Sequence, residues 1–178
     1  MDQGFEFLCN RIATEKFKIK SLKSDQIEII KNAIEGRDVL GLLPTGSGKS
    51  LCFQLFPFVF AALKKSQAPI VIVVQPLSVL IKTQAEGLKA LGIEAEFFGS
   101  EQLDPTANSR GKEGKIIFCA FPFSLFSFSP SLPIILYFHS DYFCPETVMK
   151  EEWIRFFISR KNDIGLIVID EVHSVTER

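Results

Sequence analysis

The sequence predicts an α/β fold with a mostly parallel central sheet, and two patterns support this. Continuous aliphatic and β-branched runs, of which Ile70–Val74 is the clearest, are typical of strands that are covered on both faces. Segments with helical periodicity separate these runs, and such an alternation of strands and helices favours a doubly wound sheet. The 178 residues suffice for one domain with its own core.

The expected elements follow one another along the chain. Ser24 and Asp25 offer N-cap chemistry for a short helix, which Gly36 ends. A brief apolar strand is expected at Val39–Leu42, ahead of a glycine-rich loop and a helix at about residues 49–63. Beyond Ile70–Val74 we expect a helix at residues 77–91, closed by Gly92, and strands at residues 94–98, 115–118 and 166–169.

Composition narrows the possible classes of protein only slightly. The formal net charge is −1, so any contact with nucleic acid must come from local groups rather than from a basic surface as a whole. The four cysteines are scattered singly, which predicts neither a zinc site nor a disulfide framework and favours a reducing compartment. The first residues lack the features of a secretory signal.

The glycine-rich loop is the clearest chemical motif. It reads Pro44, Thr45, Gly46, Ser47, Gly48, Lys49 and Ser50. Its glycines allow backbone N–H groups to surround a phosphate, and the following helix presents its positive end to the same anion. In such a P-loop, Lys49 reaches the β and γ phosphates of ATP, and the Ser50 hydroxyl binds Mg²⁺. The alternative is a glycine turn that arose by chance.

The end of the last predicted strand supplies the acidic partner that hydrolysis at a phosphate loop requires. The sequence there is Asp170, Glu171, Val172 and His173, which resembles the DEAH-type motif II of helicases. That resemblance implies that Asp170 holds Mg²⁺ through water, that Glu171 polarises the attacking water, and that His173 couples hydrolysis to a second lobe. A solvated strand terminus and a surface histidine are the alternatives.

Two further stretches resemble the RecQ family of DNA helicases. The segment Leu22–Gln26 is similar to the one ahead of the family's phosphate loop, which implies that Gln26 reads the adenine edge and that Lys23 stacks on the base. Residues 74–84 are similar to motif Ia, whose role in the family is contact with the DNA backbone; here Ser78 and Lys82 would make it. Thr83 replaces the family's usual acidic residue.

One departure from the phosphate-loop consensus points to superfamily 2, the helicase superfamily that includes the RecQ family. Leu43 stands where the strict motif has glycine. A residue other than glycine is common there in superfamily 2 helicases, whereas nucleotide kinases and transporter ATPases usually keep glycine.

An apolar segment at about residues 120–144 has no counterpart in the family. Residues 116–140 contain no Asp, Glu, Lys or Arg, a length that could span a membrane. Three prolines make the segment a poor helix. A membrane crossing between Lys49 and Asp170 would also place the two halves of one ATP site on opposite sides of the bilayer. Every residue from Phe121 to Pro133 is Phe, Leu, Ser or Pro, the amino acids encoded by pyrimidines at the first two codon positions. This composition suggests that the segment is a translated intron whose polypyrimidine tract is read in frame.

Together these features predict a three-layer, RecA-like P-loop NTPase lobe over residues 1–178, with its core at about residues 17–176 and without the second RecA-like lobe. By family, the function is ATP-dependent 3′ to 5′ DNA unwinding with ATP and Mg²⁺ as cofactors. DNA is the expected partner, no membrane is expected, and the oligomeric state is open. The family implies the nucleus in a eukaryote and otherwise the cytoplasm.

Three rival functions remain at this point. The chain could be a catalytically incompetent fragment that binds nucleotide, because we expect the missing lobe to supply an arginine needed for hydrolysis. It could also be a P-loop ATPase of another class, or a membrane protein built around residues 116–138.

Overall fold

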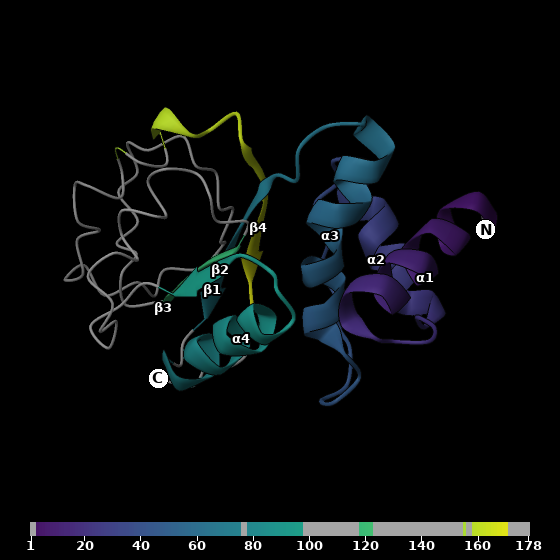
Figure 1. Cartoon of the computed structure of the whole chain (residues 1–178), viewed down its shortest axis with the longest axis horizontal. Coiled ribbons are helices and arrows are strands. Elements are labelled where there is room, and N and C mark those ends of the chain that lie inside the picture. The colour runs from purple at the N-terminus through teal and green to yellow at the C-terminus, as the bar shows by residue number, and fades with distance from the viewer. Residues whose placement is uncertain (1–2, 76–77, 98–117, 123–154, 156–157, 171–178) are drawn as a thin grey trace.

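The computed structural model describes residues 3–75, 78–97, 118–122, 155 and 158–170. Within them the chain forms four helices and four strands (Figure 1). The helices are α1 (Gln3–Phe17), α2 (Ser24–Ile34), α3 (Lys49–Lys64) and α4 (Ser78–Ala90). The strands are β1 (Ile70–Gln75), β2 (Ala95–Phe97), β3 (Phe118–Pro122) and β4 (Ile164–Ile169).

The four strands form one sheet in the order β2-β3-β1-β4, and all three pairings are parallel. Strand β1 lies in the interior, where Val71 is level with Phe118 of β3 and with Leu166 of β4. The α/β class and the parallel sheet expected from the sequence are thereby confirmed. Because the strands are parallel, the carboxyl ends of β1 and β4 lie at the same edge of the sheet.

The described helices pack against one face of this sheet. Val71 and Val73 share one face of β1, and they belong to the same buried cluster as residues of all four helices. Figure 1 shows α1, α2 and α3 together on one side of β4. The described residues therefore supply two of the three predicted layers, the sheet and one layer of helices.

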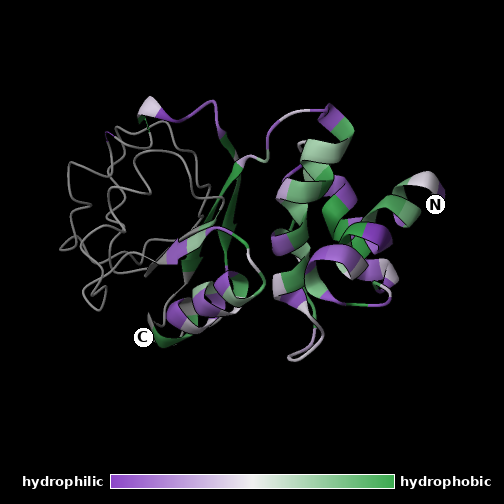
Figure 2. Cartoon of the chain, in the orientation of Figure 1, coloured by the Kyte–Doolittle hydropathy of each residue, from purple (hydrophilic) through white to green (hydrophobic). Residues whose placement is uncertain are grey.

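Helix α3 is apolar around most of its circumference because it is covered on more than one side. It contacts α1 and α2 as well as β1 and β4, and its buried residues include Leu55, Phe56 and Val59. Figure 2 shows the hydrophobic colouring along α3 and along the strands. Burial of this helix fixes the position of its first turn, which carries Lys49 and Ser50.

Helix α1 was not expected from the sequence, although its pattern is visible in hindsight. Cys9, Ile12, Ala13 and Phe17 are buried and recur at the spacing of one helical face. The ring of Phe17 meets that of Phe58 edge to face, with 6.0 Å between centroids. Helix α1 thus packs on α3 and holds it from the side away from the sheet.

The strand predicted at Val39–Leu42 is wrong. These residues have no regular secondary structure, and the side chains of Leu40 and Leu42 are 80% and 84% exposed. A strand requires ladder hydrogen bonds to a neighbour, and no described strand pairs with this segment. A cavity of about 230 Å³, lined by Val39, Gly41 and β4, lies beside it instead.

The other boundaries differ from the prediction by small amounts. Helix α2 ends as expected, with Gly36 at a φ of 77°, but Lys23 is its N-cap instead of Ser24 or Asp25. The backbone N–H of Lys23 donates to the Gln26 side chain at 2.9 Å, which is half of a capping box. Gly92 follows α4 with a φ of 73°.

Strand β3 changes the limits of the apolar segment. The predicted strand at residues 115–118 overlaps β3 only at Phe118, since residues 115–117 lie outside the described residues. Ala120–Pro122, assigned to the insert, pair with Val73–Gln75 of β1. Residues 123–144 lie outside the described part of the chain. Among the residues that the structure describes, no helix has the length and apolar character needed to span a membrane.

Candidate functional site

The glycine-rich loop joins the extended segment after α2 to the first turn of α3. Gly46 and Gly48 have φ values of 75° and 86°, a left-handed conformation that favours glycine. The N–H of Ser47 donates to the Pro44 carbonyl at 3.1 Å and closes the turn. Gly48 is the N-cap of α3, so the loop lies at the positive, N-terminal end of this 16-residue helix.

The polar groups of this loop fit an anion. Among the described residues, no backbone partner is present for the N–H groups of Gly48, Lys49 and Ser50. The Ser47 hydroxyl oxygen is inaccessible to solvent and likewise has no hydrogen-bond partner within the described residues. The first N–H groups of a helix have no partner within the helix, and they lie at its positive end, so these donors fit a phosphate-like ligand.

The Gln26 side chain braces the loop through hydrogen bonds to its carbonyls. Its Nε2 donates to the carbonyls of Ser47 and Gly48, at 3.2 and 3.1 Å, and Gln26 is only 4% exposed. The Lys23 ammonium also donates to the Ser47 carbonyl, at 3.4 Å. A Cβ atom on Gly48 would lie 2.7 Å from Gln26 Nε2, so the contact requires glycine at that position. The resemblance implied a role of Gln26 toward the base, and this second role toward the loop has no signal in the local sequence.

Lys49 and Asp170 line the same cavity, which has a volume of about 230 Å³. Asp170 follows β4, and its N–H donates to the Val74 carbonyl of β1 at 2.9 Å, which fixes it at the carboxyl edge of the sheet. Lys49 is half-buried at the start of α3, and it forms no ion pair with any residue that the structure describes. The fold thus brings together a lysine and a carboxylate that are distant in the sequence.

A second cavity of about 320 Å³ lies at the loop. Its lining includes Lys23, Gln26, Thr45, Gly46 and Ser47. Leu43 lines both cavities, and of the loop residues 44–50 Lys49 lines the first cavity. The first cavity has the lysine and the carboxylate, and the second has the two residues that resemble a base-recognition segment.

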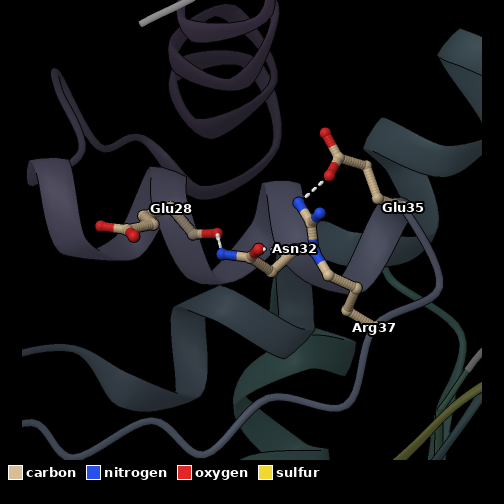
Figure 3. Close-up of polar contacts among 4 residues, drawn as sticks. All are labelled: Glu28, Asn32, Glu35 and Arg37. Carbon is tan, nitrogen blue, oxygen red and sulfur yellow. Dashed lines mark hydrogen bonds and ion pairs between the residues drawn. The ribbon is translucent and has the colours of Figure 1, made fainter.

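Two cavity residues were not singled out from the sequence. Arg37 lines the first cavity, and its guanidinium contacts the Glu35 carboxylate and donates to Asn32 Oδ1 at 2.8 Å (Figure 3). The amide of Asn32 in turn donates to the Glu28 carbonyl at 2.8 Å, so Arg37 is held at the end of α2. Cys52 also lines this cavity, and burial raises the pKa of its thiol to about 11.

Several predicted site residues cannot be placed beside this loop. Glu171 and His173 lie outside the described residues, and so does the side chain of Ser78, although its backbone begins α4. Lys82 is half-buried on α4.

These features define the class of the protein. A parallel sheet, a glycine loop at the start of a helix and an acidic residue at the end of a neighbouring strand belong to the P-loop α/β proteins. Residues 23–178 match the model of the DEAD/DEAH box helicase family. The chain belongs to that family.

The curated relatives are RecQ-type helicases, which confirms the resemblance drawn from the sequence. The chain is 31% identical to ATP-dependent DNA helicase Q-like SIM of Arabidopsis thaliana, over 98% of its own length and 17% of the relative. It is 30% identical to ATP-dependent DNA helicase RecQ of Haemophilus influenzae, over 90% of the chain and 22% of the relative. It is 33% identical to ATP-dependent helicase SGS1 of Saccharomyces cerevisiae, over 91% of the chain and 10% of the relative. The chain therefore spans less than a quarter of each of these relatives.

Proposed function

We propose that this chain is the ATP-binding part of an ATP-dependent DNA helicase of RecQ type. The observation that carries the proposal is the cavity shared by Lys49 and Asp170, at a helix start where the N–H groups of Gly48, Lys49 and Ser50 have no backbone partner among the described residues. Family membership and the relatives' names support helicase activity. The second layer of helices that would complete a RecA-like lobe is part of the same proposal.

The proposed roles follow from charge and position. Lys49 and the loop N–H groups bind the triphosphate, because cationic and N–H donors next to a helix N-terminus favour an anion. Ser50 and Asp170 hold Mg²⁺, for which hydroxyl and carboxylate oxygens are suitable ligands. Bound Mg²⁺ would neutralise charge on the phosphate oxygens. Glu171 orients the attacking water, and His173 links the site to a second lobe.

Base and DNA recognition complete the proposal. Lys23 and Gln26 line the second cavity beside the loop, where an adenine would lie next to its phosphates. Both hydrogens of Gln26 Nε2 go to the loop carbonyls, so recognition of an adenine would fall to the second lone pair of Gln26 Oε1, on a side chain that also supports the phosphate loop. Ser78 and Lys82 on α4 contact the DNA backbone. The nucleus in a eukaryote, or the cytoplasm in a bacterium, is the compartment where DNA is available.

Nucleotide binding by the full chain tests the proposal. A fluorescent ATP analogue should bind in the presence of Mg²⁺, and Lys49→Ala should weaken binding at least about tenfold, since a hydrogen bond to a charged group contributes roughly 1.5–3 kcal/mol. Lys64→Ala, at the exposed far end of the same helix, is the matched control and should bind like the wild type. Equal binding by the wild type and by Lys49→Ala would contradict the proposal.

If the protein binds nucleotide, an assay of ATP hydrolysis distinguishes a helicase motor from a fragment that only binds nucleotide. Hydrolysis that single-stranded DNA stimulates, and that Lys49→Ala abolishes, supports a motor. Binding without turnover supports a nucleotide-binding fragment.

A further inference from the structure

A hydrogen bond connects α4 directly to the phosphate loop. Gln84 Nε2 donates to Ser50 Oγ at 3.4 Å, across 34 residues of sequence, and both side chains are partly buried. Gln84 lies in the stretch that resembles motif Ia, and no role was predicted for it. The bond falls on the one hydroxyl that the proposed function gives to the metal.

Packing of α4 holds Gln84 in place. Ala85 and Leu88 are buried against the sheet, and at 100° per residue Gln84 lies on one flank of the stripe that they form. Lys82 lies on the opposite flank of that stripe. Because α4 contacts β1, β2 and β3, the backbone that carries Gln84 is fixed relative to the carboxyl edge of the sheet.

The chemistry of the two groups gives the bond a direction. An amide NH₂ can only donate, whereas a serine hydroxyl has one hydrogen and two lone pairs. Donation from Gln84 occupies one lone pair of Ser50, leaves the other for a cation and turns the hydroxyl hydrogen elsewhere. Without this donor, a serine in the first turn of a helix rotates freely among its staggered positions and can donate to nearby backbone carbonyls.

We propose that Gln84 is a positioning residue that holds the Ser50 hydroxyl in the orientation in which it binds Mg²⁺. This inference rests on the proposed function, because it takes Ser50 as a metal ligand. It makes α4, which also carries the candidate DNA-binding residues Ser78 and Lys82, part of the support of the metal site. In this role Gln84 would act through Ser50.

The test is a Mg²⁺ titration of ATP-analogue binding by the full chain with the variant Gln84→Met. Methionine keeps the length and the packing of glutamine but cannot donate. The Mg²⁺ concentration at half-maximal effect should rise about two- to fivefold, the range expected for the loss of one long hydrogen bond. Binding of the analogue in EDTA should remain unchanged, which a general disturbance of the loop would not allow.

Gln67→Met is the matched control, because Gln67 is exposed beyond the far end of α3 from Ser50. It should titrate like the wild type. An unchanged Mg²⁺ midpoint in Gln84→Met, or equal weakening with and without Mg²⁺, would overturn the role of Gln84 and leave nucleotide binding standing. A wild-type chain that binds no nucleotide would overturn both this inference and the proposed function.

Discussion

Replacing Gly48 with alanine tests the brace between Gln26 and the phosphate loop without any ligand. Gly48 has a φ of 86°, and a Cβ there would lie 2.7 Å from Gln26 Nε2. Gly36 has a similar φ of 77° at the end of α2, but a Cβ there would meet no atom within 4 Å. Gly36→Ala is therefore a matched control that pays the same backbone cost without the contact.

The expected magnitudes follow from these contacts. An alanine at a left-handed position costs about 1–2 kcal/mol, which both variants share. The Gln26 side chain can move away from a new Cβ, but it then loses its bonds to the carbonyls of Ser47 and Gly48. At 0.5–1.5 kcal/mol for each bond, Gly48→Ala should cost roughly 1–3 kcal/mol more than Gly36→Ala.

Urea denaturation of the full chain at neutral pH, followed by circular dichroism, measures the difference in unfolding free energy. A double-mutant cycle with Gln26→Ala isolates the contact, because the extra cost of Gly48→Ala should disappear once the amide is gone. If Gly48→Ala costs no more than Gly36→Ala, or if the extra cost persists without Gln26, then Gln26 does not brace the loop.

Three further substitutions probe the elements around the site. Gly165→Ala should destabilise the chain by about 1–3 kcal/mol in thermal unfolding, since its Cβ would lie 2.6 Å from the ring of Pro69. Lys89→Met should cost about 1–3 kcal/mol, because it removes the cation 2.6 Å from Glu96, a carboxylate that is 2% exposed. Burial raises the pKa of the Cys9 thiol to about 11. We therefore expect Cys9→Ala to have a lower unfolding free energy than the wild type at neutral pH, and this difference to shrink as the pH rises.

The sign of the pH effect follows from linkage. The folded state keeps the Cys9 proton above pH 9.0, where the unfolded state releases it, so this contribution to stability is full below pH 9 and is lost toward pH 11. The difference in unfolding free energy between the wild type and Cys9→Ala should narrow by up to about 2 kcal/mol over that range. A constant difference would contradict the burial of this thiol.

Matched variants control the other two predictions. Gly87→Ala, on α4 with nothing within 4 Å of its Cβ, should stabilise the chain by about 0.5–1 kcal/mol. Arg11→Met breaks an exposed pair with Glu15 at 4.0 Å and should cost less than about 0.5 kcal/mol. Equal losses for Gly165→Ala and Gly87→Ala, or for Lys89→Met and Arg11→Met, would refute the respective prediction.

Local patterns predicted the elements whose residues carry their own signal. The β-branched run of β1 indicates a strand covered on both faces, and all of Ile70–Val74 are buried. The glycine loop and the helix after it follow from the spacing of Gly46, Gly48 and Lys49. Helix α1 carries the same kind of signal, the four-residue spacing of its buried residues Cys9, Ala13 and Phe17.

Contacts between distant residues could not be predicted in this way. The segment Val39–Leu42 has the composition of a strand, and it lines a cavity together with the edge strand β4, yet the two do not pair in the described sheet. The bonds from Gln26 to the loop span 21 and 22 residues, and the bond from Gln84 to Ser50 spans 34. Only the fold reveals which polar side chains meet across such separations.

Calorimetric titration with a non-hydrolysable ATP analogue, with Mg²⁺ and with EDTA, tests most directly whether Lys49 and Asp170 act on one magnesium-bound triphosphate. Lys49→Ala should weaken binding in both conditions, whereas Asp170→Asn should remove the gain from Mg²⁺ and keep the affinity in EDTA. Asp163→Asn, at the opposite end of β4, should behave like the wild type. Retention of the full Mg²⁺ gain by Asp170→Asn would contradict a shared site.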